Sequence, residues 1–205
     1  MKLVNHKGHW CPKGSEKAWN RYWSRASDMD LAIGLCPMRR SVVQAGGNIG
    51  AWPLYLGKKF KRIFTFEPEP VNFECLVRNT EHRTNILCTN AALGEAPGTM
   101  HLNVCNSIGS HHLVQKPGDT KVTTIDELGL DDLDLIVADV EGAEFLLIKG
   151  AMRTISRCKP IIQLEDRGHG IKKGFGNTFE DILKFLPEYA PTARVGRDVI
   201  LRLKI

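Results

Sequence analysis

The sequence predicts an α/β fold with a mainly parallel, doubly wound sheet, and three observations support this prediction. Predicted strands alternate with predicted helices along most of the chain, as in strand–helix–strand units. The first central strand, residues 42–45, runs into a glycine-rich turn that opens a helix. Polar residues follow several strands where each one ends, and parallel strands end at one edge of a sheet. A ligand is therefore expected at that edge.

The N-terminal part of the chain is expected to be helical over residues 15–35. Ser15 is a suitable N-cap, and Pro37 ends the helix because the residue before a proline avoids helical backbone angles. The apolar face of this helix carries Trp19, Trp23 and Ala26. We expect a helical segment over residues 1–40 that packs on a cofactor-binding domain over residues 41–205, so that the two form a single domain.

The remaining elements follow from apolar runs that glycine, proline and polar clusters separate. Strands are expected over 42–45, 62–66, 85–89, 133–138 and 160–165, and helices over 49–59, 69–80 and 143–156. An insertion precedes the strand at 133–138, with strands at 99–105 and 121–124 around a polar loop, 106–119. The chain ends with a helix over 178–185 and an antiparallel strand pair, 192–195 and 198–203.

The glycine-rich turn and an acidic residue after the next strand predict a site for an adenosine-containing cofactor. The turn reads Gln44-Ala45-Gly46-Gly47-Asn48-Ile49-Gly50, and its glycines let the backbone approach a ligand, because a Cβ would collide with it. Glu67 ends the second strand, and its carboxylate can accept two hydrogen bonds from a ribose diol. The glycine spacing departs from G-x-G-x-x-G, which disfavours a dinucleotide. It suits S-adenosylmethionine (SAM), which carries no pyrophosphate.

Four blocks of the sequence, in this order, resemble the FkbM-type SAM-dependent methyltransferases. They are residues 44–50, 66–70, 90–94 and 139–144, the last followed by Gly150-Ala151. The resemblance covers about residues 41–166 and implies a Rossmann-like class I methyltransferase fold with an antiparallel last strand. It also implies an enzyme that methylates hydroxyl groups, often on sugars. The compact length and the Gln-Ala-Gly-Gly-Asn turn are similar to members that bacteriophages encode.

The resemblance assigns the cofactor contacts to particular positions of this chain. They are Gln44, Gly46, Gly47, Asn48, Gly50, Glu67, Pro68, Asn90, Ala91 and Asp139. Glu67 would bind the ribose, although a carboxylate there can also favour the start of the next helix. Asn90 and Ala91 would lie beside the adenine or form an ordinary turn. Gln44 stands where related enzymes carry an acidic residue that helps to bind the methionine ammonium, and a neutral amide does so less strongly.

The candidate catalytic residues are Asp139, Glu141, Glu165 and His111. Methyl transfer is an in-line displacement for which the protein aligns the reactants, and an alcohol acceptor must also lose a proton to a base. Asp139 can act as that base or bind the cofactor's amino group. With Glu141 and Glu165 it can instead bind a divalent cation, a role we favour less. A third reading is that Glu141 or Glu144 only favours the N-terminus of the helix at 143–156.

Three histidines lie in predicted loops beside the same sheet edge, His111 and His112 in the insertion and His169 after the strand at 160–165. A histidine in a mobile loop near a pocket can act as a base, although most loop histidines are only solvated. Trp52, just after the glycine turn, can line the pocket or belong to the core between helix and sheet.

The composition agrees with one buried α/β core, since the chain has 205 residues, of which 42% are hydrophobic and 25% charged. It has no apolar run of about 18 residues and no apolar centre of a signal peptide near its N-terminus, so we expect a cytoplasmic protein without a membrane partner.

The six cysteines form no C-x-x-C pair, so the sequence predicts neither a zinc ribbon nor a disulfide framework. Cys88 and Cys105 fall in predicted strands. The net charge of +5 is modest, and its cluster at 58–62 suits a solvated helix end as well as a nucleic-acid contact, so a nucleic-acid partner is not indicated.

The sequence therefore favours a SAM-dependent O-methyltransferase that acts on a small-molecule or glycan acceptor and releases S-adenosylhomocysteine (SAH). Two alternatives stay open. One is a SAM-binding module of the same fold without turnover, and the other, less favoured, is an NAD-dependent oxidoreductase. Neither the acceptor nor the oligomeric state is predicted.

Overall fold

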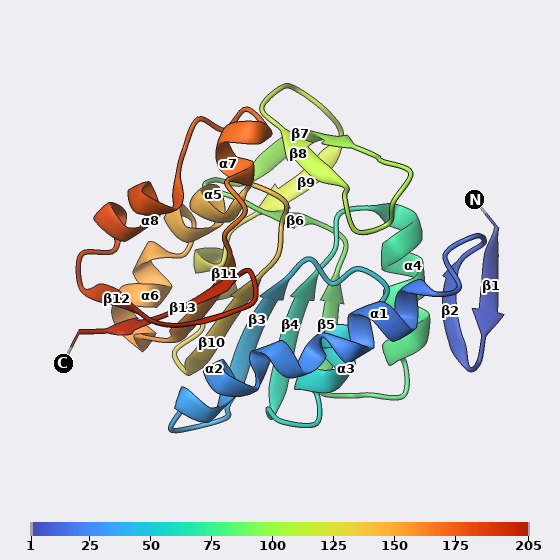
Figure 1. Cartoon of the computed structure of the whole chain (residues 1–205), viewed down its shortest axis with the longest axis horizontal. Coiled ribbons are helices and arrows are strands. Elements are labelled where there is room, and N and C mark those ends of the chain that lie inside the picture. Colours follow the sequence, from blue (N-terminus) through green and yellow to red (C-terminus); the bar gives the residue numbers. More distant parts are fainter. Residues whose placement is uncertain (1, 205) are drawn as a thin grey trace.

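The computed structural model describes residues 2–204, and seven strands of this range form its central sheet (Figure 1). In sheet order they are β12 (Tyr189–Val195), β13 (Asp198–Leu203), β11 (Ile161–Glu165), β10 (Leu133–Ala138), β3 (Ser41–Ala45), β4 (Arg62–Phe66) and β5 (Ile86–Thr89). The strands from β11 to β5 are parallel, whereas β13 runs antiparallel to both β11 and β12. The predicted α/β class, parallel sheet and antiparallel last strand are confirmed.

The strand order reverses between β3 and β10. From β3 the chain moves one way along the sheet through β4 and β5, and it later returns to the other side of β3 with β10 and β11. The connections after β3 and β10 therefore turn away from each other, which leaves a crevice beyond the carboxyl ends of these strands. The fold places a ligand site there.

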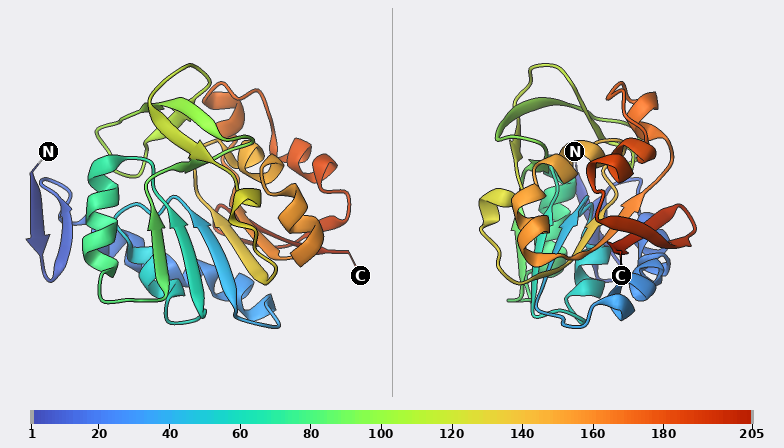
Figure 2. Two further views of the ribbon diagram at one scale, coloured as in Figure 1. Left: turned by 180° about the vertical axis from the view of Figure 1, so that it is seen from behind. Right: turned by 90° about the vertical axis from the view of Figure 1, so that its left-hand side faces the viewer.

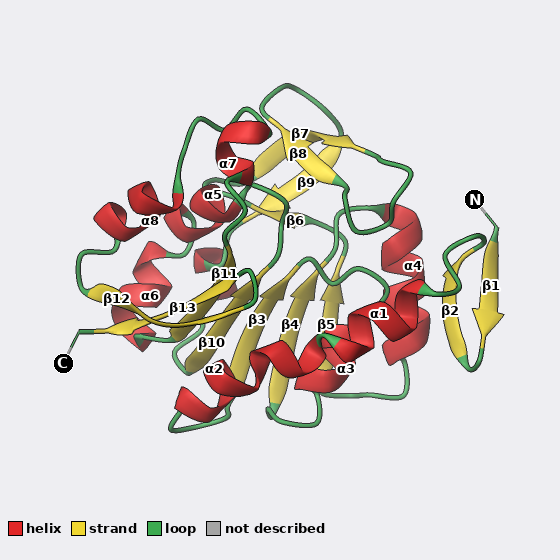
Figure 3. Ribbon diagram, viewed as in Figure 1, coloured by secondary structure: helices red, strands yellow, loops and turns green. Residues whose placement is uncertain are grey.

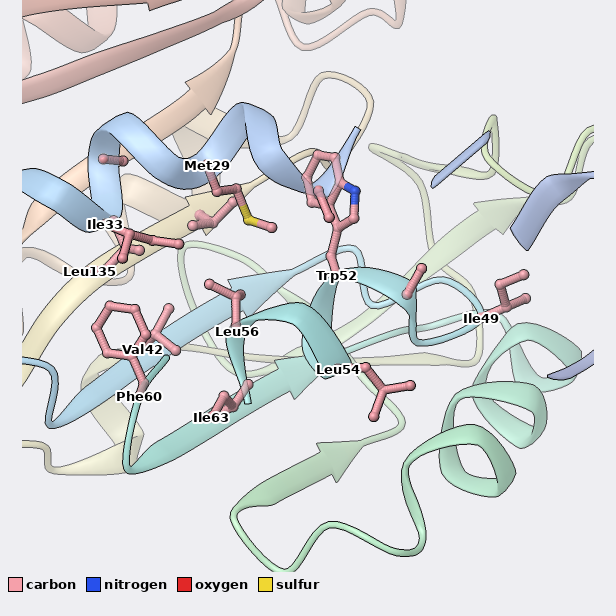
Figure 4. Packing of buried hydrophobic residues seen from close by; sticks show 14 of the residues in the cluster. Met29, Ile33, Val42, Ile49, Trp52, Leu54, Leu56, Phe60, Ile63 and Leu135 are labelled. Carbon is pink, nitrogen blue, oxygen red and sulfur yellow. The ribbon is translucent and has the colours of Figure 1, made fainter. Parts of the chain in front are cut away.

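Alternate residues of β10 face two separate apolar cores, as expected for a strand that is buried on both faces. Leu135 and Val137 belong to the first core, which Figure 4 shows in close view. The helices that contribute to it include α1 (Ala18–Ser24), η1 (Ala26–Met29), α2 (Asp30–Leu35) and α3 (Ala51–Leu56). Ile136 and Ala138 belong to the second core. That core packs against α5 (Glu144–Lys149), α6 (Met152–Cys158) and α8 (Phe179–Phe185).

A smaller sheet lies beyond the carboxyl ends of the central strands (Figures 1 and 2). Its strands are, in sheet order, β6 (Ala92–Leu93), β9 (Thr120–Thr123), β7 (Gly98–Asn103) and β8 (His112–Val114). The short helix α7 (His169–Lys172) lies at the same end of the molecule. Helix α4 (Pro70–Thr80) precedes the edge strand β5 and packs against it, and η2 (Asp126–Leu128) precedes β10. The insertion is thus positioned to cover the crevice.

The N-terminal segment differs from the single helix predicted for residues 15–35. It begins with a hairpin of β1 (Leu3–His6) and β2 (His9–Pro12), and helix α1 starts after Lys17 rather than at Ser15 (Figure 3). Lys7 and Gly8 both have positive φ, at 52° and 85°, which is the geometry of a tight hairpin turn. The prediction of a helical segment over residues 1–40 is therefore wrong for its first part, because the Lys7-Gly8 turn reverses the chain into a hairpin.

The hairpin is fixed by the side chain of Asn79 on α4. The amide of Asn79 accepts a hydrogen bond from Trp10 N (2.7 Å) and donates one to Trp10 O (2.9 Å), as a neighbouring strand would. The same Nδ2 also donates to Ile49 O in the glycine turn, over 2.7 Å.

The predicted apolar face of the N-terminal helical segment is confirmed, since Trp19 and Ala26 are buried in the first core.

Most other elements agree with the prediction within a few residues, and three do not. The helix predicted over 143–156 is divided into α5 and α6 at Gly150, where a Cβ would lie 1.9 Å from Gly94 O. Strand β7 ends at Asn103, so Cys105 is not in a strand, and the loop predicted over 106–119 contains β8.

All six cysteines are free. Within residues 2–204, no helix has the length and apolar character needed to cross a bilayer.

Candidate functional site

A pocket opens at the carboxyl ends of β3, β4 and β10, under the insertion. It is lined from the glycine turn by Gly46, Gly47, Asn48 and Ile49, from the end of β4 by Phe66, Glu67 and Pro68, and from the end of β10 by Asp139, Val140 and Glu141. Its free volume is about 90 Å³. This is smaller than the roughly 300 Å³ or more that small-ligand pockets usually have, and the insertion loop around Ile108 covers the pocket. Asn48 Nδ2 and Asn72 Nδ2 hold that loop by donating to Ile108 O over 2.7 and 2.9 Å.

The glycine turn is packed against the ends of its two neighbouring strands. Gly46 N and Gly47 N both donate to Phe66 O, over 3.0 and 2.9 Å. Gly46 has φ +85°, and a Cβ on it would lie 2.2 Å from Asp139 O, at the end of β10. A Cβ on Gly47 would lie 2.7 Å from Thr65 Oγ1. The packing of the protein itself therefore requires glycine at these positions, whether or not a ligand also approaches the turn.

The carboxylate of Glu67 is buried and held at this turn, with 5% of the residue exposed. Its Oε2 accepts from Asn48 N (2.8 Å), and its Oε1 accepts from Glu69 N (2.9 Å). Burial raises the pKa of Glu67 to about 7, although these two backbone donors oppose the shift. The alternative role at the start of α4 belongs to Glu69, whose side chain accepts from Asn72 N. Each Glu67 oxygen keeps a second lone pair.

Several residues predicted to contact the cofactor do not line the pocket and instead form hydrogen bonds that stabilise the turn. Gln44 is fully buried, donates to Gly46 O (2.9 Å) and accepts from Thr65 Oγ1 (2.5 Å). Asn90 Nδ2 donates to Glu67 O over 2.8 Å. The lining residues of this pocket also do not include Gly50, Ala91 and Glu165. Direct contact of these residues with a cofactor stays a prediction.

Carboxyl groups gather beside the pocket around one guanidinium group. Asp139 and Glu141 line the pocket, and the side chain of Glu165, only 1% exposed, lies behind them. Arg167 Nε is 2.7 Å from Glu165 Oε1, and its Nη1 is 3.6 Å from Glu141 Oε1. Burial raises the pKa of Asp139, and burial together with the charge of Asp139 raises the pKa of Glu165 to about 9. His169 Nδ1 lies 3.0 Å from Glu141 Oε2. We call Glu141, Glu165 and His169 the Glu-Glu-His cluster.

The predicted helix-capping role falls to Glu144 rather than to Glu141. Glu144 Oε1 accepts from Val140 N (3.2 Å) and from Gly142 N (3.3 Å). Burial raises the pKa of Glu144 to about 7. Glu141 has a left-handed backbone, at φ 55°, and its side chain faces Arg167 instead. Glu141 is thus available for chemistry or ligand binding.

The histidines of the insertion line the pocket, but the Nδ1 atom of each already has a partner. His111 Nδ1 accepts from Cys105 N over 2.9 Å, so a neutral His111 carries its proton on Nε2. Burial lowers the pKa of His111, which favours this neutral form. His112 Nδ1 lies 3.0 Å from Ser110 O, to which it can only donate. In this arrangement His111 offers a hydrogen-bond donor rather than a base.

Several residues without a predicted site role also line the pocket. They are Tyr22 from α1, Ala92, Leu93, Leu102, Ile108 and Leu113 from the insertion and its approach, and Ala143. Trp52 combines both roles considered for it, because it lines the pocket and is buried in the first core. Its Nε1 donates to Tyr22 O over 3.0 Å. The N-terminal segment therefore contributes directly to the site.

Comparison with known proteins gives a family match and two relatives. The model of the methyltransferase FkbM domain matches residues 44–191. Methyltransferase 1 of Beauveria bassiana is 29% identical over 142 residues, which covers 53% of this chain and 57% of that protein. Methyltransferase sdnD of Sordaria araneosa is 25% identical over 158 residues, covering 56% of this chain and 61% of that protein. The chain thus spans less than two thirds of the length of either relative.

Solved structures of low sequence identity share the fold. The methyltransferase FkbM from Methylobacillus flagellatus has a TM-score of 0.54 and 23% identity, over 83% of this chain and 45% of that one. A putative methyltransferase from Streptococcus mutans, solved in complex with SAH, has a TM-score of 0.52 and 10% identity, over 85% of this chain and 94% of that one. Both comparisons support a Rossmann-like methyltransferase fold.

Proposed function

Because this chain belongs to the FkbM methyltransferase family, we propose that it transfers a methyl group from SAM to a hydroxyl group of a small-molecule or glycan acceptor. In this reaction the acceptor oxygen bonds to the methyl carbon as the carbon–sulfur bond breaks, and SAH leaves with the electron pair. The hydroxyl proton passes to a base. The protein's main task is to align oxygen, carbon and sulfur.

The position of Glu67 is the observation that carries this proposal. Its carboxylate is fixed by two backbone donors at the glycine turn, and it lines the pocket at the topological switch point. The remaining lone pairs can accept hydrogen bonds from the two hydroxyls of a ribose. Burial of this carboxylate without a ligand is unfavourable, as its raised pKa indicates, so a diol that donates to it gives a binding gain.

Asp139 is the residue that we assign as the base. It lines the pocket directly after β10, on the opposite side of the glycine turn from Glu67. His111 is less suited, since its Nδ1 accepts the backbone N–H of Cys105. A carboxylate next to the reacting hydroxyl contributes typically about 10²- to 10⁴-fold to such a reaction.

A second candidate is a SAM-binding module without turnover, and Gln44 favours it. The side chain of Gln44 is fully occupied by Thr65 and by the turn's own backbone. It therefore supplies no negative charge for the methionine ammonium. The two candidates share the cofactor and differ only in transfer.

Calorimetric titration with SAM, SAH and NAD tests the cofactor. We expect SAM and SAH to bind and NAD to give no heat. Glu67→Ala should weaken SAM binding by about 1.5 to 3 kcal/mol, since charge-assisted hydrogen bonds are lost. Glu69→Ala is the matched control, because it removes a buried carboxylate two positions away that caps α4 and does not line the pocket. Equal SAM affinity of wild type and Glu67→Ala would show that the ribose lies elsewhere.

Transfer is tested with SAM carrying an isotopically labelled methyl group and a panel of polyhydroxylated acceptors. The enzyme proposal predicts a labelled ether on one acceptor class, with one SAH released per ether formed. SAM binding without labelled product on any acceptor would favour the binding module. NAD binding without SAM binding would contradict both candidates.

A further inference from the structure

We propose that the Glu-Glu-His cluster is a binding site for one divalent transition-metal cation, such as Mn²⁺. Glu141, Glu165 and His169 each offer one ligand atom, and these atoms lie within 4.8 Å of one another. This inference goes beyond methyl transfer and does not depend on it. The cluster lies where the end of β11 and helix α7 meet the pocket.

The geometry of the cluster separates two sets of oxygens. Arg167 lies beside the Oε1 atoms, at 2.7 Å from that of Glu165 and 3.6 Å from that of Glu141. The Oε2 atoms lie instead beside His169 Nδ1, which is 3.0 Å from Glu141 Oε2 and 3.9 Å from Glu165 Oε2. The guanidinium can therefore keep both carboxylates oriented while their second oxygens bind an ion.

These separations are close to those that a shared ion requires. Ligand atoms at about 2.1 Å from one cation lie about 3.0 Å apart at a right angle and about 3.6 Å apart at 120°. The pair formed by His169 and Glu141 already has the first separation. The pair formed by His169 and Glu165 needs to contract by only a few tenths of an ångström, which a side-chain rotation provides.

A second observation is the lack of hydrogen bonds inside the cluster. The side chain of Glu165 is 1% exposed, yet neither of its oxygens accepts a hydrogen bond of acceptable geometry from any described residue. His169 Nδ1 is equally without a hydrogen bond, although its neighbours are close. Buried polar atoms normally have such partners. A cation would satisfy the Glu165 oxygen and the imidazole nitrogen together.

The donor set indicates the class of ion. Two carboxylate oxygens suit hard divalent cations, while one imidazole shifts the preference toward first-row transition metals. Arg167 is the nearest positive charge, and the carboxylate of Asp139 adds a negative one on the pocket side. Because Glu141 also lines the pocket, an ion bound here would lie at the pocket's margin and keep room for water or a ligand oxygen.

Electron paramagnetic resonance tests the site directly. The full chain, first treated with a chelator and desalted, is titrated with MnCl₂, and bound ion is measured as loss of the free hexaaqua signal. We expect one site per chain, with pulsed spectra showing a nitrogen coupling from one imidazole. Glu141→Gln, Glu165→Gln and His169→Ala should each weaken binding about tenfold or more. Glu188→Gln, an exposed glutamate outside the cluster, should bind as wild type does.

The outcomes separate the metal site from the proposed function. Absence of bound Mn²⁺ in wild type, or equal binding by wild type and all three cluster variants, would overturn the site. If Glu165→Gln does not fold, the decision rests on His169→Ala, which changes a short helix at the surface and can be checked by its melting curve. SAM titration of the Mn²⁺-loaded and of the chelator-treated protein is read separately, and absence of SAM binding in both forms contradicts the cofactor proposal and not the metal site.

Discussion

The two acidic regions at the edge of the sheet differ in how far the protein itself satisfies them. At the glycine turn, both oxygens of Glu67 accept backbone hydrogen bonds. In the Glu-Glu-His cluster, Glu165 is as deeply buried as Glu67, with 5% of each residue exposed, and it accepts none from the described residues. The first region has spare lone pairs for a ligand, whereas the second contains a buried carboxylate without a hydrogen-bond donor among the described residues. A buried carboxylate that accepts no hydrogen bond is unfavourable, which supports the cation proposed for this cluster.

The largest expected effect comes from Asp139, which lies between the two regions. Asp139→Asn should lower the rate of methyl transfer by about 10²- to 10⁴-fold, because the amide cannot take the acceptor's proton. SAM affinity, measured by titration, should stay within about threefold of wild type. An equal fall in affinity would show that Asp139 binds the cofactor, and the two regions would then form one cofactor site.

The packing of the glycine turn against β10 is tested by a pair of glycines with the same backbone angle. Gly46 and Gly8 both have φ +85°, but a Cβ meets Asp139 O at 2.2 Å in the first case and no described atom within 4 Å in the second. Gly8→Ala should lower the free energy of unfolding by about 1 to 2 kcal/mol through backbone strain alone. Gly46→Ala should lower it by about 3 to 5 kcal/mol, because overpacking is added.

Urea denaturation of both variants measures this difference. Equal losses for Gly46→Ala and Gly8→Ala would mean that the turn moves away from β10 freely. The protein's own contacts would then hold the Glu67 region no more firmly than the Glu-Glu-His cluster, and the two regions would not differ in this respect.

The smallest expected effect is a pH dependence of SAM binding through Glu67. Its pKa in the ligand-free protein is raised to about 7, and the ionised form is the better acceptor for ribose hydroxyls. As the pH falls through 7 the carboxyl group is protonated, so affinity should decrease, by up to about eightfold between pH 7.5 and pH 6. Titrations at several pH values measure this effect. Glu67→Gln should show a flat profile, and the same slope in that variant would assign the titration to another group.

Much of the Glu67 region could be predicted from the sequence because its parts are local. The turn at residues 44–50 and the carboxylate after β4 lie on strands that are adjacent in the sheet, and a strand followed by a helix fixes where they end. The strands at 62–66, 133–138 and 198–203 have the predicted bounds. The strong apolar runs and clear turn residues at these places leave few alternatives.

The sequence predicts only part of the Glu-Glu-His cluster, because the conformation of a loop brings its residues together. Glu141 and Glu165 are carboxylates that the sequence places near strand ends, but His169 joins them through α7, a helix of only four residues without a clear periodic signal. The contribution of Tyr22 to the pocket likewise depends on the docking of α1, which no local pattern specifies. Gln44 was predicted to contact the cofactor, but its side chain bonds to Thr65 and to the turn and does not face the pocket.

The side chain of Asn79 links the amino end of the protein to its cofactor turn. One amide group bonds to both backbone groups of Trp10 and to the carbonyl of Ile49. Proteolytic trimming before α1 would therefore remove two of its partners and loosen the third, far from the cut in sequence.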